Sequence, residues 1–245
     1  MISTQQENDI FQDIWNDLLD KNQIPVEKPH GVVLGGQPGA GKSALLQQAE
    51  KEQGGNLIII NGDTFREYHP RFEEIQAEYG RDAPTHTAPF AAKMTERVLA
   101  KATDEGYNIA IEGTFRTADT PIKTLQGLKD KGYSTAVYVK ATPATVSWER
   151  TKERYNKAEA AGLHPRHVPE EFHDKVVAAL PENVDKVFQS GLADNFRIYS
   201  DTRKLYDSAM QTNQKPSEVI RKELNRNVQT QHIREPKIQK QCMKL

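Results

Sequence analysis

The first 20 residues of the chain carry apolar side chains at a helical spacing. Six of them recur in pairs four residues apart and so form one stripe along a helix that Ser3 or Thr4 can cap: Ile10, Phe11, Ile14, Trp15, Leu18 and Leu19. We predict an N-terminal helix over residues 5–20. Such a stripe is typical of a helix that packs on its own domain, and a binding surface for a partner protein is the alternative.

Short apolar runs alternate with longer amphipathic segments through the rest of the chain. The strand-like runs are residues 31–35, 57–60, 108–111, 135–139 and 196–199, and the helical patterns span residues 42–53, 89–104, 121–131, 143–161 and 170–190. The second and third runs show no polar alternation, which is typical of strands buried on both faces. The alternation predicts an α/β fold with a doubly wound, mostly parallel sheet flanked by helices.

The first predicted strand runs directly into a glycine-rich loop. Residues 36–43 match the pattern G-x-x-x-x-G-K-[ST] between a strand and a helix, where this pattern forms a phosphate-binding P-loop. We expect nucleotide contacts from all eight residues: Gly36, Gln37, Pro38, Gly39, Ala40, Gly41, Lys42 and Ser43. Lys42 is expected to bridge the β- and γ-phosphates of ATP or GTP, and the Ser43 hydroxyl to hold Mg²⁺.

Composition bears on the expected binding partners and on the expected cellular compartment. With 36% hydrophobic and 27% charged residues, the 245-residue chain can bury a sizeable core. A net charge of -1 gives no overall attraction to nucleic acid or to an anionic membrane. The single cysteine, Cys242, excludes an intramolecular disulfide and a cysteine-based zinc cage. Because no apolar run approaches membrane-spanning length and no leader-like segment opens the chain, we expect a cytoplasmic protein.

Two predicted strands end in isolated carboxylates. Asp63 follows the run LIIING, and Glu112 lies in YNIAIEGTF. The carboxyl ends of parallel strands share one sheet edge with the P-loop, so both side chains are expected beside the nucleotide phosphates. We predict that Asp63 is the base that accepts the proton of an acceptor hydroxyl during phosphoryl transfer. Glu112 is expected to contact substrate hydroxyls or a Mg²⁺-bound water; helix capping is the alternative for both carboxylates.

A basic segment, residues 148–168, has the character of a lid. Arg150 and Arg154 lie four residues apart on one helical face, and Arg166 follows beyond a Gly-Leu-His-Pro break. These cations are expected to close over the phosphates and to stabilise the charge of the transferring phosphoryl group. The alternative is a solvated helix face on which the interleaved glutamates pair with them.

The end of the chain is predicted to add little to the domain. Residues 1–225 are expected to form a single P-loop kinase domain, followed by a basic tail over residues 226–245. From Arg221 onward we expect a solvated helical end and a frayed tail, with a basic docking tail as the alternative. No zinc site is expected, because His164 and His167 lack helical spacing and have no accompanying cysteine or acidic ligand pattern.

Several stretches together resemble the zeta toxins of bacterial toxin–antitoxin pairs. They are LGGQPGAGKS, IIINGDTFREYHP, FAAKMTERV, YNIAIEGTFRTADTP and RTKERY with PRHVP, and they occur in the family's order between residues 32 and 169. The P-loop is common, whereas NGDTFR with HP and IEGTFRT are not. Beyond Pro169 the likeness is weak. The resemblance implies a kinase that uses Mg²⁺ with ATP or GTP.

The resemblance also implies an acceptor, a set of site residues and a partner. The acceptor would be the sugar 3′-hydroxyl of UDP-N-acetylglucosamine or a related UDP-sugar, so that peptidoglycan precursor supply would fail. By position, the resemblance implies catalytic roles for Asp63, Lys42, Arg154 and Arg166, with His167 as the competing position for Arg166. It also implies substrate contacts at Asp63, Glu96, Glu112, Thr114 and Arg116. It further implies a small helical antitoxin over the nucleotide site, and we hypothesise that the N-terminal helix joins that contact.

Two other functions remain open from the residues alone. The same P-loop, base and lid would serve a kinase of a nucleoside, a nucleotide or another small hydroxyl compound, which substrate profiling would distinguish. A non-catalytic nucleotide-dependent switch, read by a partner protein, is the third possibility. The missing Walker-B Asp-Glu pair and the isolated Asp63 argue against a switch.

Overall fold

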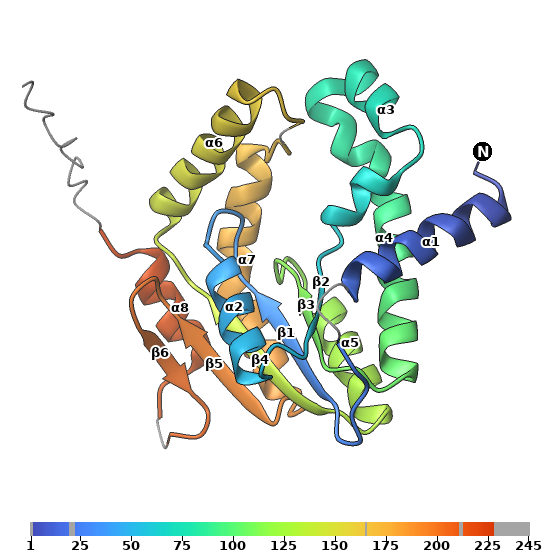
Figure 1. Ribbon diagram of the computed structural model, residues 1–245. Helices are drawn as coiled ribbons and strands as arrows, with labels where there is room; N and C mark the ends of the chain where they lie inside the picture. The colour runs from blue at the N-terminus through green and yellow to red at the C-terminus, as the bar shows by residue number, and fades with distance from the viewer. Residues whose placement is uncertain (1, 20–22, 165, 211–212, 228–245) are drawn as a thin grey trace, which may run out of the picture.

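A six-stranded sheet forms the centre of the molecule in the computed structural model, which describes residues 2–19, 23–164, 166–210 and 213–227 (Figure 1). In spatial order its strands are β2 (Ile58–Ile60), β3 (Ile109–Glu112), β1 (His30–Gly35), β4 (Ser134–Lys140), β5 (Asn195–Tyr199) and β6 (Lys204–Asp207). The first five are parallel, and β6 is antiparallel to β5. The predicted α/β fold with a mostly parallel sheet is therefore confirmed.

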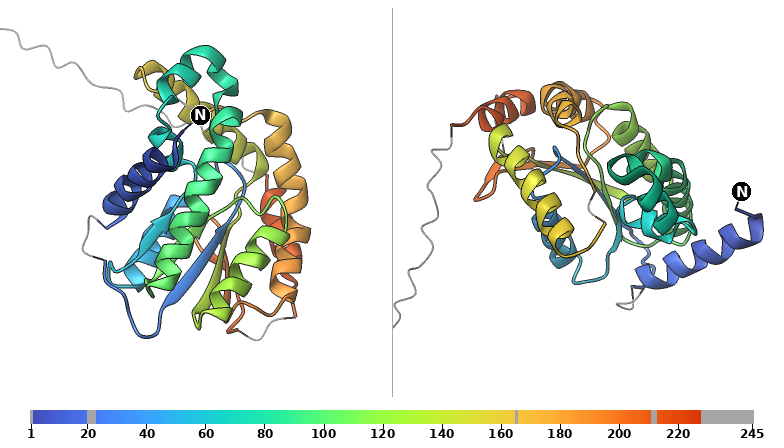
Figure 2. Two further views of the ribbon diagram at one scale, coloured as in Figure 1. Left: turned by 90° about the vertical axis from the view of Figure 1, so that its right-hand side faces the viewer. Right: turned by 90° about the horizontal axis from the view of Figure 1, so that it is seen from above.

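Helices cover both faces of the sheet (Figure 2). They are α1 (Thr4–Leu18), α2 (Ser43–Glu52), α3 (Phe72–Tyr79), α4 (Ala83–Asp104), α5 (Asp119–Asp130), α6 (Ala144–Ala160), α7 (Glu170–Gln189) and α8 (Pro216–Leu224), with short 3-10 helices η1 (Thr64–Tyr68) and η2 (Gly80–Asp82). In β1, Val33 faces the larger core under α4, α5, α7 and α8, whereas Val32 and Leu34 face the smaller core under α2. Both faces are apolar, which explains the unbroken hydrophobic runs.

The N-terminal helix packs on the domain itself. Ser3 caps α1 in a capping box with Gln6. Ile14 and Trp15 are buried in the larger core, and the Trp15 ring meets the edge of the Tyr107 ring at a centroid distance of 5.6 Å. The prediction that this stripe packs on its own domain is confirmed, with the helix ending at Leu18.

The segment between β2 and β3 differs from the prediction. The structure forms η1, α3 and η2 before α4, none of which the hydrophobic pattern indicated. Helix α4 begins at Ala83 rather than at residue 89, because Pro84 occupies its first turn and Pro89 lies inside the helix. Proline favours the first turn of a helix, and Pro84 rather than Pro89 occupies that position, so the predicted start at residue 89 is wrong.

The C-terminal part of the described chain also differs from the prediction. Strand β6 extends the sheet, and α8 packs on it and on α7. Within the predicted solvated end, Glu223 and Leu224 are each only 6% exposed, so the prediction is wrong for these two residues, whereas Arg221, Lys222 and residues 225–227 are exposed as expected. Most of the predicted basic tail, residues 228–245, lies outside the described residues.

The fold brings the carboxyl ends of the parallel strands to one edge of the sheet. There the P-loop leaves β1, and α3 and α6 stand on either side, at the top of Figure 1. None of the described helices combines the length and apolar character needed to cross a membrane.

Candidate active site

The P-loop turns where β1 passes into α2. Gly36 and Gly39 have φ angles of 147° and 75°, which residues with side chains rarely adopt. Neither position has room for a side chain. A Cβ atom on Gly36 would lie 2.5 Å from the carbonyl oxygen of Lys140, and a Cβ atom on Gly39 would collide with the carbonyl oxygen of Ser147. Helix α2 begins directly after the loop and directs its positive end toward it. The loop therefore has the backbone form of an anion cradle.

Lys42 links this cradle to the end of β3. Its Nζ atom donates to the carbonyl oxygens of Gly36 at 3.0 Å and Gln37 at 3.3 Å, and lies 3.6 Å from Oε1 of Glu112. Burial lowers the pKa of Lys42, and the Glu112 carboxylate opposes that change. Glu112 is the last residue of β3, and the next helix is α5, so the capping alternative for Glu112 is wrong.

Asp63 lies beyond β2, at the start of η1. Its carboxylate accepts a hydrogen bond from Nε of Arg66 at 3.1 Å and pairs with Arg166. Asp63 occupies the N-cap position of η1 but makes no capping hydrogen bond, so the capping alternative holds for its position and not for its carboxylate. Asn61 shapes the turn, because its Oδ1 accepts the Asp63 N–H at 3.1 Å while its Nδ2 donates to Glu112 at 3.3 Å. One amide side chain thus ties the backbone of Asp63 to the carboxylate of Glu112.

Arg66 is a site residue that the sequence analysis missed. Besides Asp63, its guanidinium donates to the carbonyl oxygen of Pro84 at 2.6 Å and to Oγ1 of Thr87 at 2.9 Å. Burial lowers the pKa of Arg66. These bonds fix Asp63 against the start of α4. The available signal was the spacing of three residues between an acid and an arginine on a short helix.

The three predicted lid arginines have different surroundings. Arg150 makes two hydrogen bonds to the Asp201 carboxylate, at 2.9 and 3.2 Å. Arg154 faces the cleft and, among the described residues, forms no hydrogen bond or ion pair. Arg166 pairs with Asp63, and burial lowers the pKa of Arg166. The alternative of a helix face paired with its own glutamates does not describe Arg150, whose partner Asp201 lies in the β5–β6 turn, and Arg154 and Arg166 both line the cleft.

A single cleft of about 1610 Å³ brings most of the predicted site together. Ten predicted residues line it: Pro38, Gly39, Lys42, Asp63, Glu96, Glu112, Thr114, Arg116, Arg154 and Arg166. The other predicted P-loop residues do not: Gly36, Gln37 and Ala40 are buried, and Gly41 and Ser43 are exposed. His167, the competing position to Arg166, is also not among the lining residues and instead contacts the Tyr155 ring.

The cleft continues beyond the carboxylates into a groove between α4 and α5. Its walls carry small and hydroxyl side chains: Ala88, Ala92, Thr95, Ala100 and Thr103 from α4, and Thr120, Thr124 and Gly127 from α5. Lys123 adds positive charge along the α5 side, whereas Lys131 is paired with the Asp104 carboxylate at 2.6 Å. Glu96 lies on α4, and Thr114 and Arg116 lie on the loop between β3 and α5. The site therefore extends well past the phosphates.

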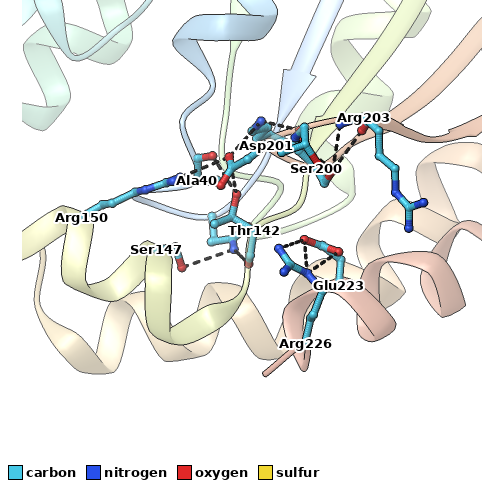
Figure 3. A network of polar contacts seen from close by, with 12 residues as sticks. Ala40, Thr142, Ser147, Arg150, Ser200, Asp201, Arg203, Glu223 and Arg226 are labelled. Carbon is cyan, nitrogen blue, oxygen red and sulfur yellow. Dashed lines mark hydrogen bonds and ion pairs between the residues drawn. The ribbon is translucent and has the colours of Figure 1, made fainter. Parts of the chain in front are cut away.

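A second polar network supports the P-loop from the side of β4 and β5 (Figure 3). Thr142 Oγ1 donates to the carbonyl oxygen of Ala40 at 2.9 Å. The Asp201 carboxylate accepts hydrogen bonds from Arg150 and forms an ion pair with Lys140 at 3.1 Å. Burial by itself would raise the pKa of Asp201, but the hydrogen bonds from Arg150 and Lys140 hold it below its usual value. The network joins the P-loop, α6 and the β5–β6 turn.

A buried chain of hydrogen bonds connects the P-loop with α6 and α7. Gln37 Nε2 donates to the carbonyl oxygen of Thr142 at 2.5 Å and to Ser147 Oγ at 3.3 Å. Ser147 Oγ lies 2.9 Å from Nε2 of His173, which is 1% exposed. The side chains of Gln37 and His173 thus support the loop.

Fold and site together define a P-loop kinase-like protein. The model of the zeta toxin family matches residues 16–211, so the chain belongs to that family, whose members are toxins of toxin–antitoxin systems. The chain is 40% identical over 228 residues to "Toxin zeta" of Streptococcus pyogenes, covering 91% of this chain and 79% of the relative. It is 39% identical over 196 residues to "Toxin PezT" of Streptococcus pneumoniae serotype 4, covering 79% and 78%. The resemblance seen in the motifs is confirmed.

Solved structures agree with this assignment. A chain from the study of the PezAT chromosomal toxin–antitoxin system of Streptococcus pneumoniae superposes with a TM-score of 0.81 at 32% identity, covering 91% of this chain and 87% of that chain. The AvrRxo1-ORF1:-ORF2 complex gives a TM-score of 0.66 at 13% identity, covering 89% and 72%. The second similarity concerns the fold alone.

Proposed function

We propose that the protein is a kinase that transfers the γ-phosphoryl group of ATP or GTP to the sugar 3′-hydroxyl of UDP-N-acetylglucosamine or a related UDP-sugar. The observation that carries the proposal is the position of Asp63 in the same cleft as Lys42, Glu112 and Arg154. A carboxylate, a P-loop lysine and a free arginine around one cleft are the groups that phosphoryl transfer to a hydroxyl needs.

In the proposed reaction the acceptor oxygen forms a bond to the γ-phosphorus as the bond from that phosphorus to the β–γ bridging oxygen breaks. Asp63 takes the hydroxyl proton, and the nucleoside diphosphate leaves from the P-loop. Lys42 and Arg154 stabilise the charge that spreads over the phosphoryl oxygens. Arg66 keeps the Asp63 carboxylate in place through its bonds to α4. Arg166, which pairs with Asp63, lines the same cleft.

Mg²⁺ suits the donors at this site. In phosphoryl transfer this ion is held by one or two protein oxygens together with substrate phosphates and water, not by a protein cage. Within the described ranges no group of three or more histidine, cysteine or acidic side chains could form such a cage. Ser43 at the start of α2 and Glu112 beside Lys42 supply oxygens of the required kind. The bound ion would neutralise charge on the β- and γ-phosphates.

The size and lining of the cleft favour an extended acceptor. Pockets for single small molecules usually have volumes of about 300–1,000 Å³, and this cleft exceeds that range because it holds the P-loop side together with the groove between α4 and α5. The hydroxyl-rich groove between α4 and α5 offers hydrogen bonds to a polar ligand, and Lys123 suits an anionic one. A nucleoside diphosphate sugar has both properties, whereas a simple nucleoside leaves much of the groove unfilled.

As part of this proposal the protein acts as the toxin of a pair and is held inactive by a small helical antitoxin. The solved relative of Streptococcus pneumoniae comes from a study of a toxin–antitoxin system. The AvrRxo1-ORF1:-ORF2 complex, which shares the fold, has been solved with ATP. Phosphorylation of the UDP-sugar would deprive the cell wall of precursor. Helix α1 is proposed to join the antitoxin contact; unchanged antitoxin affinity after deletion of residues 1–20 would refute that part.

An acceptor panel tests the proposal. Release of nucleoside diphosphate from Mg·ATP and Mg·GTP is measured with UDP-N-acetylglucosamine, UDP-glucose, free nucleosides and no acceptor. We expect release to depend on the UDP-sugar in the wild-type protein and to be lost in Lys42→Ala, which weakens both nucleotide binding and transfer. Preference for a nucleoside would indicate a different P-loop kinase. Slow release that no acceptor changes would indicate a nucleotide switch.

A further inference from the structure

The turn that follows β3 is held in an unfavourable backbone conformation. Phe115 has a φ angle of 54°, and among the described residues it is the only one other than glycine with positive φ. Its ring is 3% exposed and belongs to the larger core. A bulky residue rarely adopts this left-handed conformation, and it persists only where surrounding structure imposes it. The turn therefore needs an external restraint.

Asn183 on α7 supplies that restraint. Its Nδ2 donates to the carbonyl oxygen of Phe115 at 3.0 Å and to that of Arg116 at 2.8 Å. The left-handed residue turns both carbonyls toward α7, away from any strand partner, and an amide NH₂ has two hydrogens, one for each. Asn183 is 8% exposed, so these bonds are shielded from water. Buried carbonyls without such donors would be strongly disfavoured.

Residues at the end of β1 pack closely against the turn. The Phe115 ring lies over Gly35 at the end of β1, where a Cβ atom would come within 2.7 Å of the ring. The N–H of Gly113 donates to the carbonyl oxygen of Leu34 at 2.8 Å and fixes the start of the turn to β1. The ring and the two carbonyls thus anchor one side of the loop in the protein interior.

The opposite side of the same loop faces the cleft. Thr114 and Arg116, which flank Phe115, both line it. The Arg116 guanidinium lies 5.8 Å from the centre of the Phe172 ring, which also belongs to α7. Helix α7 therefore holds the loop from below through Asn183 and borders the cleft through Phe172. A change of the Phe115 backbone toward an ordinary conformation would rotate Thr114 and Arg116 out of their present positions.

We propose that Asn183 is a positioning residue for the acceptor: by clamping the Phe115–Arg116 backbone it sets the directions of Thr114 and Arg116 in the acceptor part of the cleft. The inference rests on the proposed kinase function for its effect on catalysis, while the clamp itself rests on the contacts of Asn183. A change at Asn183 should affect binding of the acceptor and not of the nucleotide, because neither hydrogen bond of Asn183 reaches the P-loop.

The test compares Asn183→Leu, which keeps the branched shape but removes both donors, with Val184→Ala. Val184 is a fully buried neighbour on α7 and reports the effect of weakening the core at the same place. Asn183→Leu is expected to raise the KM for the UDP-sugar by about tenfold or more while the KM for the nucleotide changes by less than about twofold. In amide hydrogen exchange, a peptide covering residues 113–117 should exchange faster than in Val184→Ala.

Two results would overturn the proposal: an unchanged acceptor KM in Asn183→Leu, or equal losses for acceptor and nucleotide. Should Asn183→Leu not fold, Asn183→Gln, which keeps two donors on a longer side chain, is measured instead, and acceptor KM and loop exchange must both rise. If the wild-type protein does not phosphorylate the UDP-sugar, the proposed function fails, and the loop exchange decides the clamp alone. Exchange equal to that of Val184→Ala would then refute the clamp.

Discussion

The Nζ atom of Lys42 lies 3.6 Å from Oε1 of Glu112, so the P-loop lysine is paired with the carboxylate that ends β3. Burial lowers the pKa of Lys42 and Glu112 counteracts this, which means that the carboxylate helps to keep the ammonium charged. The pair places the phosphate-binding cation at the junction between the nucleotide loop and the acceptor part of the cleft.

Replacement of Glu112 by glutamine tests this pairing. With the carboxylate charge removed, the pKa of Lys42 is expected to fall further, so the ammonium is lost at a lower pH. The alkaline limb of the pH profile for nucleotide binding should therefore move to lower pH in Glu112→Gln. Binding measured by calorimetry across the alkaline range provides the check, with Glu96→Gln as a matched control on α4. An alkaline limb that stays in place would separate Glu112 from the charge of Lys42.

The two arginines of α6 provide a matched pair for the lid. Arg154 faces the cleft without a protein partner among the described residues, whereas Arg150 is bound to Asp201. Arg154→Ala is expected to lower kcat by about 10²- to 10³-fold, because a cation near the transferring phosphoryl group is lost. Arg150→Ala should affect kcat far less. Steady-state kinetics of the two variants checks this, and equal losses would contradict the assignment of Arg154 to the phosphoryl group.

Gly39 allows a similar comparison for the P-loop. Alanine at this position would meet the carbonyl oxygen of Ser147 as well as a φ angle of 75°, whereas alanine at Gly54, with a φ angle of 61°, has nothing within 4 Å. The φ penalty alone is about 1–2 kcal/mol and is common to both. Gly39→Ala should therefore abolish measurable nucleotide binding while Gly54→Ala retains it. Retention in both variants would mean that the loop can move away from α6.

Much of the fold could be predicted because its signals are local. The apolar runs that became β1 to β5 and the glycines of the P-loop are contiguous in sequence, and Ser3 with Gln6 marks the start of α1 within four residues. Strand β6 and helix α8 were missed because they are short and gain their stability from contacts with β5 and α7. The predicted start of α4 at residue 89 was wrong because Pro84, not Pro89, lies in its first turn.

The residues of the site likewise divide into those with a local sequence signal and those that depend on contacts made on folding. Asp63 and Glu112 could be placed because parallel strands end on one edge. Arg66, although only three residues from Asp63, was missed because its role depends on contacts with α4. Asn183 lies 68 residues from Phe115, and no sequence pattern indicates either the hydrogen bond between them or the left-handed backbone that makes the bond necessary. Such relationships exist only once the chain has folded.

The central claim is that Asp63 serves as the base in phosphorylation of a UDP-sugar. The most direct measurement is intact-product mass spectrometry of UDP-N-acetylglucosamine after reaction with Mg·ATP, with the wild-type protein and Asp63→Ala side by side. We expect a gain of one phosphoryl group with the wild type and a loss of about 10²- to 10⁴-fold or more in Asp63→Ala, which still binds nucleotide. An unmodified UDP-sugar with the wild type, or equal product from both proteins, would contradict it.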